Sequence, residues 1–133
     1  MAAPIKLNLK IYQGSTFTQV LRWESSTRVY VPITGISKSA PMVVTAPAHG
    51  IPIGWRAKIT NVSGMKEANT TEYNIITDAT EDTVIFNQIN SLAYSAYTSG
   101  GVLEYNQPHN ITGYTARMQI REKIESEDII FEL

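Results

Sequence analysis

The tripeptide Ala48-His49-Gly50 is the stretch of the sequence whose residue types come closest to a catalytic motif. A histidine beside a glycine in a proline-rich turn can act as a general base. The sequence has no serine in a G-x-S-x-G turn and no H-E-x-x-H motif to accompany it. The alternative is that the ring caps the turn by hydrogen bonding to the backbone, and the isolation of His49 favours that alternative.

The acidic residues in the middle of the chain do not show the spacing of a carboxylate pair or a metal site. They are Glu67, Glu72, Asp78, Glu81 and Asp82, all in predicted turns. A calcium loop needs closely alternating Asp and Asn ligands, which this run does not supply. Because the chain has no cysteine and only two histidines, His49 and His109, thiolate and multi-histidine metal sites are excluded. The sequence therefore predicts no catalytic residue, no metal site and no cofactor.

Length and composition exclude several other classes of function. A chain of 133 residues with 43% hydrophobic and 17% charged residues can build a packed core, as one ordinary domain or two very small ones. The net charge of −1 lacks the basic excess of nucleic-acid-binding proteins. No apolar stretch approaches the roughly 18 residues that cross a membrane, and the first residues lack the pattern of a signal peptide. We therefore predict that the protein is not an enzyme and that it has neither a nucleic-acid partner nor a membrane partner.

Alternation of hydrophobic and polar residues predicts an all-β protein. Strands are predicted toward the two ends of the chain, at residues 7–11, 17–23, 114–121 and 129–133, with a short one at residues 29–31. Further strands between turn signals are predicted at residues 42–45, 55–60, 73–77, 83–86 and 102–105.

The tripeptide Ile-Thr-Gly occurs twice, at residues 33–35 and 111–113, each time next to a predicted strand. One interpretation is that a host domain of residues 1–34 and 111–133 is interrupted by a second unit of residues 35–110, because surface turns tolerate insertions best. The alternative is coincidence between two common turn tripeptides. The first interpretation predicts a small β-sandwich with an inserted small β-barrel domain.

The C-terminal segment combines acidic charge with a strongly apolar end. Residues 121–133 carry five acidic and two basic side chains, whereas the remaining 120 residues sum to +2, which suits head-to-tail contacts between copies. The last large apolar residues are Ile129, Ile130, Phe131 and Leu133. An apolar strand at a terminus is an aggregation hazard unless it pairs. It either folds back as an edge strand of its own sheet or joins a sheet or groove shared with another subunit.

Tyrosines with small polar neighbours suggest a second contact region. Tyr94, Tyr97 and Tyr105 are either part of an adaptable contact surface or half-buried residues of the small barrel. In the predicted host sandwich the core residues are Trp23, Tyr114, Met118 and Phe131, and the residues facing solvent or a partner are Arg22, Arg117, Gln119 and Arg121. The predicted partner contacts are Ile129, Ile130, Phe131, Leu133, Arg117, Gln119, Arg121, Tyr94 and Tyr97.

Residues 13–23 contain Gly-Ser-Thr-Phe followed by Leu-x-Trp, and residues 111–121 run Ile-Thr-Gly-Tyr-Thr-Ala-Arg-Met-Gln-Ile-Arg. These two stretches resemble a β-sandwich module of tailed-bacteriophage structural proteins, similar in style to the N-terminal module of baseplate proteins. Residues 45–101 resemble a small β-barrel repeat of phage proteins, labelled by its likeness to the first catalytic-cysteine half-domain of ubiquitin-activating enzymes. That label implies no enzymatic activity here, because the chain has no cysteine.

The resemblance implies a virion structural protein made in the bacterial host cytoplasm. We expect a place in the tail, the baseplate or a tail adaptor, in multiple copies, with other virion proteins and copies of itself as partners. Capsid decoration on the outer shell is the nearest alternative. A further alternative is binding of a host receptor or surface glycan through Trp55, Tyr94 and Tyr97, which requires those rings to be exposed.

Overall fold

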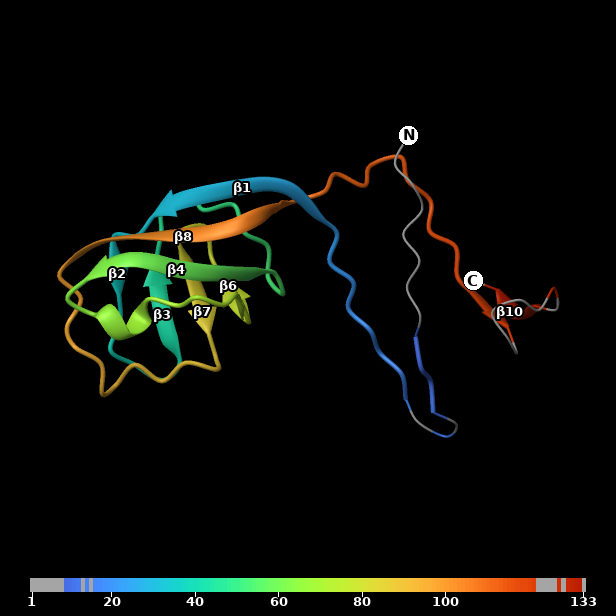
Figure 1. Cartoon of the computed structure of the whole chain (residues 1–133), viewed down its shortest axis with the longest axis horizontal. Helices are drawn as coiled ribbons and strands as arrows, with labels where there is room; N and C mark the ends of the chain where they lie inside the picture. Colours follow the sequence, from blue (N-terminus) through green and yellow to red (C-terminus); the bar gives the residue numbers. More distant parts are fainter. Residues whose placement is uncertain (1–8, 13, 15, 122–126, 128, 133) are drawn as a thin grey trace.

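The computed structural model describes residues 9–12, 14, 16–121, 127 and 129–132 of the chain (Figure 1). Its elements in chain order are the strands β1 (Glu24–Pro32), β2 (Gly35–Ile36), β3 (Met42–Thr45) and β4 (Arg56–Ser63), the short 3-10 helix η1 (Lys66–Ala68), and the strands β5 (Asn74–Ile75), β6 (Asp78–Ala79), β7 (Thr83–Phe86), β8 (Ser99–Pro108), β9 (Gln119–Arg121) and β10 (Ile129–Glu132). Within these residues, no helix has the length and apolar character needed to cross a membrane.

Residues 24–108, which we call the body, form a small sandwich of two four-stranded antiparallel sheets. One sheet has the order β1-β8-β4-β5 and the other the order β2-β3-β7-β6. The strands alternate inward apolar and outward residues, as in β3, where Met42 and Val44 are buried while Val43 and Thr45 are half-buried. The prediction of an all-β fold with a small sandwich is confirmed. This sandwich lies in residues 24–108, most of which were predicted as the inserted barrel, and the division into host and insert at residues 35 and 110 stays a prediction.

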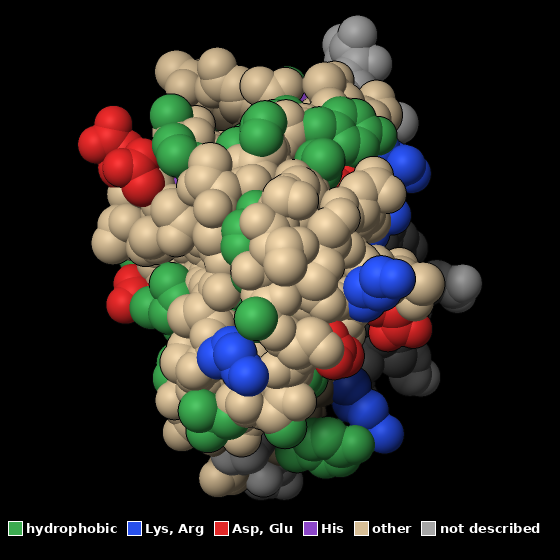
Figure 2. Space-filling model, turned by 90° about the vertical axis from the view of Figure 1, so that its left-hand side faces the viewer, with side chains coloured by type: hydrophobic (Ala, Val, Ile, Leu, Met, Phe, Trp, Pro, Cys, Tyr) green, Lys and Arg blue, Asp and Glu red, His purple; other side chains and the backbone are tan. Residues whose placement is uncertain are grey.

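The core of the body lies between the two sheets. It includes Ala57, Ile59 and Leu103 from one sheet and Met42, Val84 and Phe86 from the other, all at most 1% exposed. Burial of a large apolar side chain contributes about 1.5–3 kcal/mol relative to its exposure. The end of the body shown in Figure 2 presents hydrophobic side chains as small patches among polar surface. The body therefore covers most of its own apolar residues.

The strands predicted at residues 7–11, 17–23 and along most of 114–121 are not formed in the described chain. Residues 9–12 and 16–23 make no strand, and β9 covers only the last three residues of the third prediction. Alternation identifies a face that can be buried, but a strand also needs a neighbouring strand, which these described residues do not have. The core assignment of Trp23, Tyr114 and Met118 is wrong in this structure, because they are 38%, 53% and 38% exposed. The side chain of Phe131 lies outside the described part.

The chain enters and leaves the body at one place. Glu24 at the start of β1 lies opposite Pro108 at the end of β8, and the His109 N–H donates to the Trp23 carbonyl oxygen at 2.8 Å. Two arms run outward from this point (Figure 1). The N-terminal arm is residues 9–23; the C-terminal arm is residues 109–118 and leads to the two-stranded ribbon β9–β10. An inserted unit requires its two ends to lie side by side, as they do here. The predicted boundary differs, because β1 was assigned to the host and is a strand of the body.

Candidate functional site

His49 lies in the loop after β3, and both nitrogens of its buried ring have partners. Nδ1 accepts a hydrogen bond from the Ile51 N–H at 2.9 Å, and Nε2 lies 3.2 Å from the Thr83 carbonyl oxygen. Because Nδ1 is the acceptor, Nε2 carries the proton and donates it to that carbonyl. The residue is 2% exposed, so neither nitrogen can take a proton from a substrate. The turn-capping alternative is confirmed for His49.

A carboxylate is buried at the centre of the outer face of the sheet β1-β8-β4-β5. Glu104 on β8 is 5% exposed and lies in register with Tyr30 of β1 and Lys58 of β4. Lys58 Nζ and Arg28 Nη1 each lie 3.4 Å from a carboxylate oxygen, and the Tyr73 hydroxyl donates to it at 3.2 Å. Burial, together with that hydrogen bond, raises the pKa of Tyr73, so the hydroxyl keeps its proton. This cluster ties together strands of one sheet.

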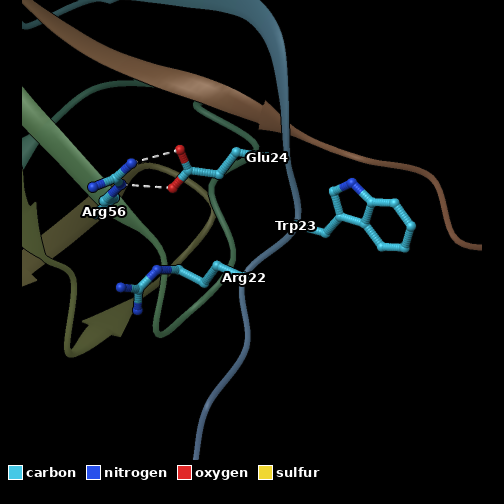
Figure 3. Close-up of a pocket in the computed structure, with 4 residues that line it drawn as sticks. All are labelled: Arg22, Trp23, Glu24 and Arg56. Atoms are coloured by element: carbon cyan, nitrogen blue, oxygen red, sulfur yellow. Dashed lines mark hydrogen bonds and ion pairs between the residues drawn. The ribbon is translucent and has the colours of Figure 1, made fainter. Parts of the chain in front are cut away.

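An open pocket of about 440 Å³ lies where the N-terminal arm meets the body, and it is lined by Arg22, Trp23, Glu24 and Arg56 (Figure 3). Arg56 Nε donates to Glu24 Oε1 at 2.6 Å and Nη2 donates to Oε2 at 2.8 Å. Asn106 Nδ2 also donates to Oε2, at 3.0 Å, and Arg22 Nη1 donates to the Gly54 carbonyl oxygen at 3.3 Å. Glu24 and Arg56 therefore pair with each other, and their contacts, together with that of Asn106, tie the start of β1 to β4 and β8.

The Glu24–Arg56 pair makes the stability of the body depend on pH. Hydrogen bonds from Arg56 hold the pKa of Glu24 below its ordinary value of about 4.3. A carboxyl group with a lowered pKa in the folded state contributes stability that is fully present above about pH 4.3 and is lost as the pH falls through the folded-state pKa. We expect Glu24→Gln to be less stable than wild type near neutral pH, with a gap that narrows below about pH 4.3.

Urea unfolding across a pH series measures this gap. Glu81→Gln, at an exposed position in the turn between β6 and β7, is the matched control and should follow wild type throughout. A Glu24→Gln gap that stays constant into the acid range would contradict the expected role of the ion pair.

Three aromatic rings pack together at the base of the arms, and we call this group the aromatic clasp. Trp23 and His109 stack with ring centroids 4.9 Å apart, and Tyr114 packs edge-on at 5.6 Å from Trp23 and 5.7 Å from His109. The Tyr114 hydroxyl and His109 Nε2 are 3.3 Å apart, within hydrogen-bond distance. The clasp joins one residue of the N-terminal arm to two of the C-terminal arm.

Exposed apolar side chains are concentrated on the two arms. On the body, the described residues of this kind are Tyr30, Ile53 and Leu92. On the arms they are Leu9, Ile11, Tyr12, Phe17, Val20, Leu21, Trp23, Ile111, Tyr114 and Met118. A folded monomer normally exposes large apolar side chains singly, whereas a contiguous set marks a surface that binds another protein or aggregates. The arms are therefore the candidate functional site.

The aromatic residues predicted to make contacts in the middle of the chain belong to the body. Tyr94 and Tyr97 are half-buried against the core, and the Tyr97 hydroxyl donates to the carbonyl oxygens of Ile33 and Gly100 at 3.1 and 2.9 Å. These contacts favour the half-buried alternative, and a partner contact at either tyrosine stays a prediction. Trp55 is 8% exposed and its Nε1 donates to a carbonyl oxygen of β8 at 2.8 Å. The prediction that a glycan stacks on Trp55 is therefore wrong, because it requires an exposed ring.

The remaining predicted contacts lie along the C-terminal arm and the ribbon. Arg117 is exposed on the arm, Gln119 begins β9 and Arg121 ends it. β10 pairs antiparallel with β9, so the apolar segment folds back as its first alternative predicts. Its predicted contacts are Ile129, Ile130 and Phe131, whose side chains, like the whole of Leu133, lie outside the described part. Among the described strands the ribbon pairs with no other, so whether a partner joins it stays a prediction.

Sequence reasoning missed the ion pairs and the clasp. Glu104, Arg28 and Lys58 come from three strands distant in sequence, so their proximity depends on the strand pairing and carries no local sequence signal. His109 carried no signal of its own, because its stacking on Trp23 depends on β1 and β8 being neighbours. Among the described residues, no three His, Asp or Glu side chains lie close enough together to hold a metal ion.

The arms, the clasp and the self-contained body are the features on which a function can be built. No family model matches the sequence, and no curated protein matches it significantly.

Proposed function

We propose that the protein is a subunit of a larger protein assembly, with the arms as its binding elements and the body as an outward-projecting unit. The observation that carries this proposal is the location of the exposed apolar side chains, most of which lie on the arms, while the body covers most of its own. Ordering an extended segment costs conformational entropy, and burial of its apolar side chains against a partner offsets that cost. On a symmetric particle, many weak contacts of this kind add up.

The assembly we propose is the virion of a tailed bacteriophage, in its tail, baseplate or tail adaptor. The sequence resemblance to phage β-sandwich modules supports this assignment. The residues that carry the resemblance are 13–23 and 111–121. These stretches belong to the N-terminal arm, and to the C-terminal arm and β9. The resemblance and the exposed apolar surface therefore fall on the same parts of the chain. The partners are other virion proteins and further copies of this chain.

Labelling of intact particles tests the proposal. We expect gold-conjugated antibodies against the body to bind the tail of particles whose genome encodes this chain, because the body faces outward when the arms are engaged. Particles of an unrelated phage are the control. Label on the head shell would overturn the tail placement in favour of capsid decoration. Absence of label from both intact and disrupted particles would overturn the virion assignment.

A further inference from the structure

We propose that the N-terminal arm of one copy pairs with the β9–β10 ribbon of a second copy, so that copies are joined head to tail. This inference rests on the proposed assembly role and names the partner of the arms. The ribbon has only two strands in the described structure, of three and four residues. Two-stranded ribbons are marginally stable in water, and at least one more strand is needed for independent stability. An added arm would supply that strand.

The N-terminal arm has the alternating pattern of a strand, but its described residues form no strand. Leu9 and Ile11 share one parity with Phe17, Leu21 and Trp23, and these five side chains are 38–68% exposed. When a strand with this alternation joins a sheet, its apolar side chains all lie on the same face of the sheet. The arm makes no strand in the described structure, although its base lies beside the base of the C-terminal arm (Figure 1). The exposed apolar face of the arm is what a strand pairing with another chain would bury.

Charge selects the ribbon as the partner of the arm. Residues 1–23 contain Lys6, Lys10 and Arg22 and no acidic residue. Residues 121–133 carry a net charge of −3. An arm is attracted to a ribbon, whereas two arms repel each other and two ribbons repel each other. The contact is therefore between unlike surfaces, and copies that repeat it in one direction form rings or filaments, whereas two copies that exchange arms reciprocally form a closed two-fold dimer.

Association in solution gives the first measurement. We expect the wild-type chain to form species larger than a monomer in sedimentation velocity as its concentration rises. Raising the salt from 0.1 to 1 M shortens the screening length from about 10 to about 3 Å and should shift the chain back toward monomer. Lys10→Glu should weaken association, and mixing it with Glu127→Lys should restore it. A chain that stays monomeric at all concentrations would overturn the inference.

Disulfide trapping identifies the surfaces, because the chain has no cysteine of its own. Ile11→Cys in the arm and Ile120→Cys in β9, mixed under oxidising conditions, should give mixed dimers in excess of either homodimer. The matched control replaces Ile11→Cys by Ile53→Cys, at a 61% exposed isoleucine of the body. Mixed with Ile120→Cys, this variant should give few mixed dimers. A chain carrying both substitutions that closes into a disulfide-linked monomer would overturn the inference in favour of pairing within one chain.

The two proposals fail separately. Loss of trapping between copies while antibodies still label the tail would refute the head-to-tail pairing and leave the virion role intact. Absence of label from the particles would refute the virion role whatever the trapping shows.

Discussion

Phe86→Ala is expected to lower the free energy of unfolding of the body by about 3–5 kcal/mol. Phe86 ends β7, is fully buried, and lies in register with Met42 of β3, which is also fully buried. Removing the ring leaves a cavity between two sheets whose strands are fixed by their ladders, so the neighbours collapse into it only partly. A domain of this size has a total stability of about 5–15 kcal/mol, so the loss is a large fraction of it.

The matched control is the same substitution on the N-terminal arm. Phe17 is 39% exposed, and Phe17→Ala should change the free energy of unfolding by less than about 0.5 kcal/mol. Urea unfolding followed by tryptophan fluorescence reports the body through the buried Trp55, provided that Trp23 is replaced by phenylalanine in every variant. Equal losses for the two alanine variants would contradict the placement of the core within residues 24–108.

Gly64→Ala is expected to cost about 4 kcal/mol. Gly64 follows β4 with a φ of +82°, a left-handed conformation that costs other residues about 1–2 kcal/mol. A Cβ atom there would also lie 2.8 Å from the Thr98 backbone nitrogen and would collide with the Ala96 carbonyl oxygen. The loops cannot move apart freely, because the Thr98 N–H donates to the Ser63 carbonyl oxygen at 3.1 Å.

Gly54 separates the collision from the backbone conformation. It has the same φ of +82°, and a Cβ atom there would meet nothing within 4 Å. Gly54→Ala should therefore cost only the conformational penalty of about 1–2 kcal/mol. Urea midpoints with unchanged slopes give both values directly. If the two variants lose the same stability, the close approach of the two loops at Gly64 is not what makes glycine necessary there.

The sequence was most informative where a strand and its neighbour both lie in the body. The alternation at residues 42–45 and 83–86 predicted β3 and β7 with their observed bounds, because each segment has one buried face. The equally clear alternation at residues 17–23 and 114–118 produced no strand. A sequence pattern records that a face can be buried, but not which surface buries it. In the body that surface is the facing sheet, whereas the described residues of the arms leave their apolar side chains exposed.

The candidate site was readable only in part. Residues 121–133, which include β10, stood out in the sequence because large apolar residues follow an acidic run, and whether they contact a partner stays a prediction. Tyr97 was not separable from an exposed contact residue, because only the fold shows its hydroxyl reaching Ile33 and Gly100. The turn-capping role of His49 was favoured in advance, since no nucleophile accompanied it, and its two ring hydrogen bonds confirm that role.

The shared origin of the arms decides how the body responds to mechanical tension. Because Glu24 lies opposite Pro108, a force that separates the arms acts on one end of the β1–β8 ladder. The ladder bonds are then loaded one after another, in unzipping, and not together, as in shear. The stack of Trp23 on His109 and the hydrogen bond between their backbones are the first contacts to break. A copy anchored through both arms would therefore extend under tension by opening from this end, while the opposite end of the sandwich keeps its packing.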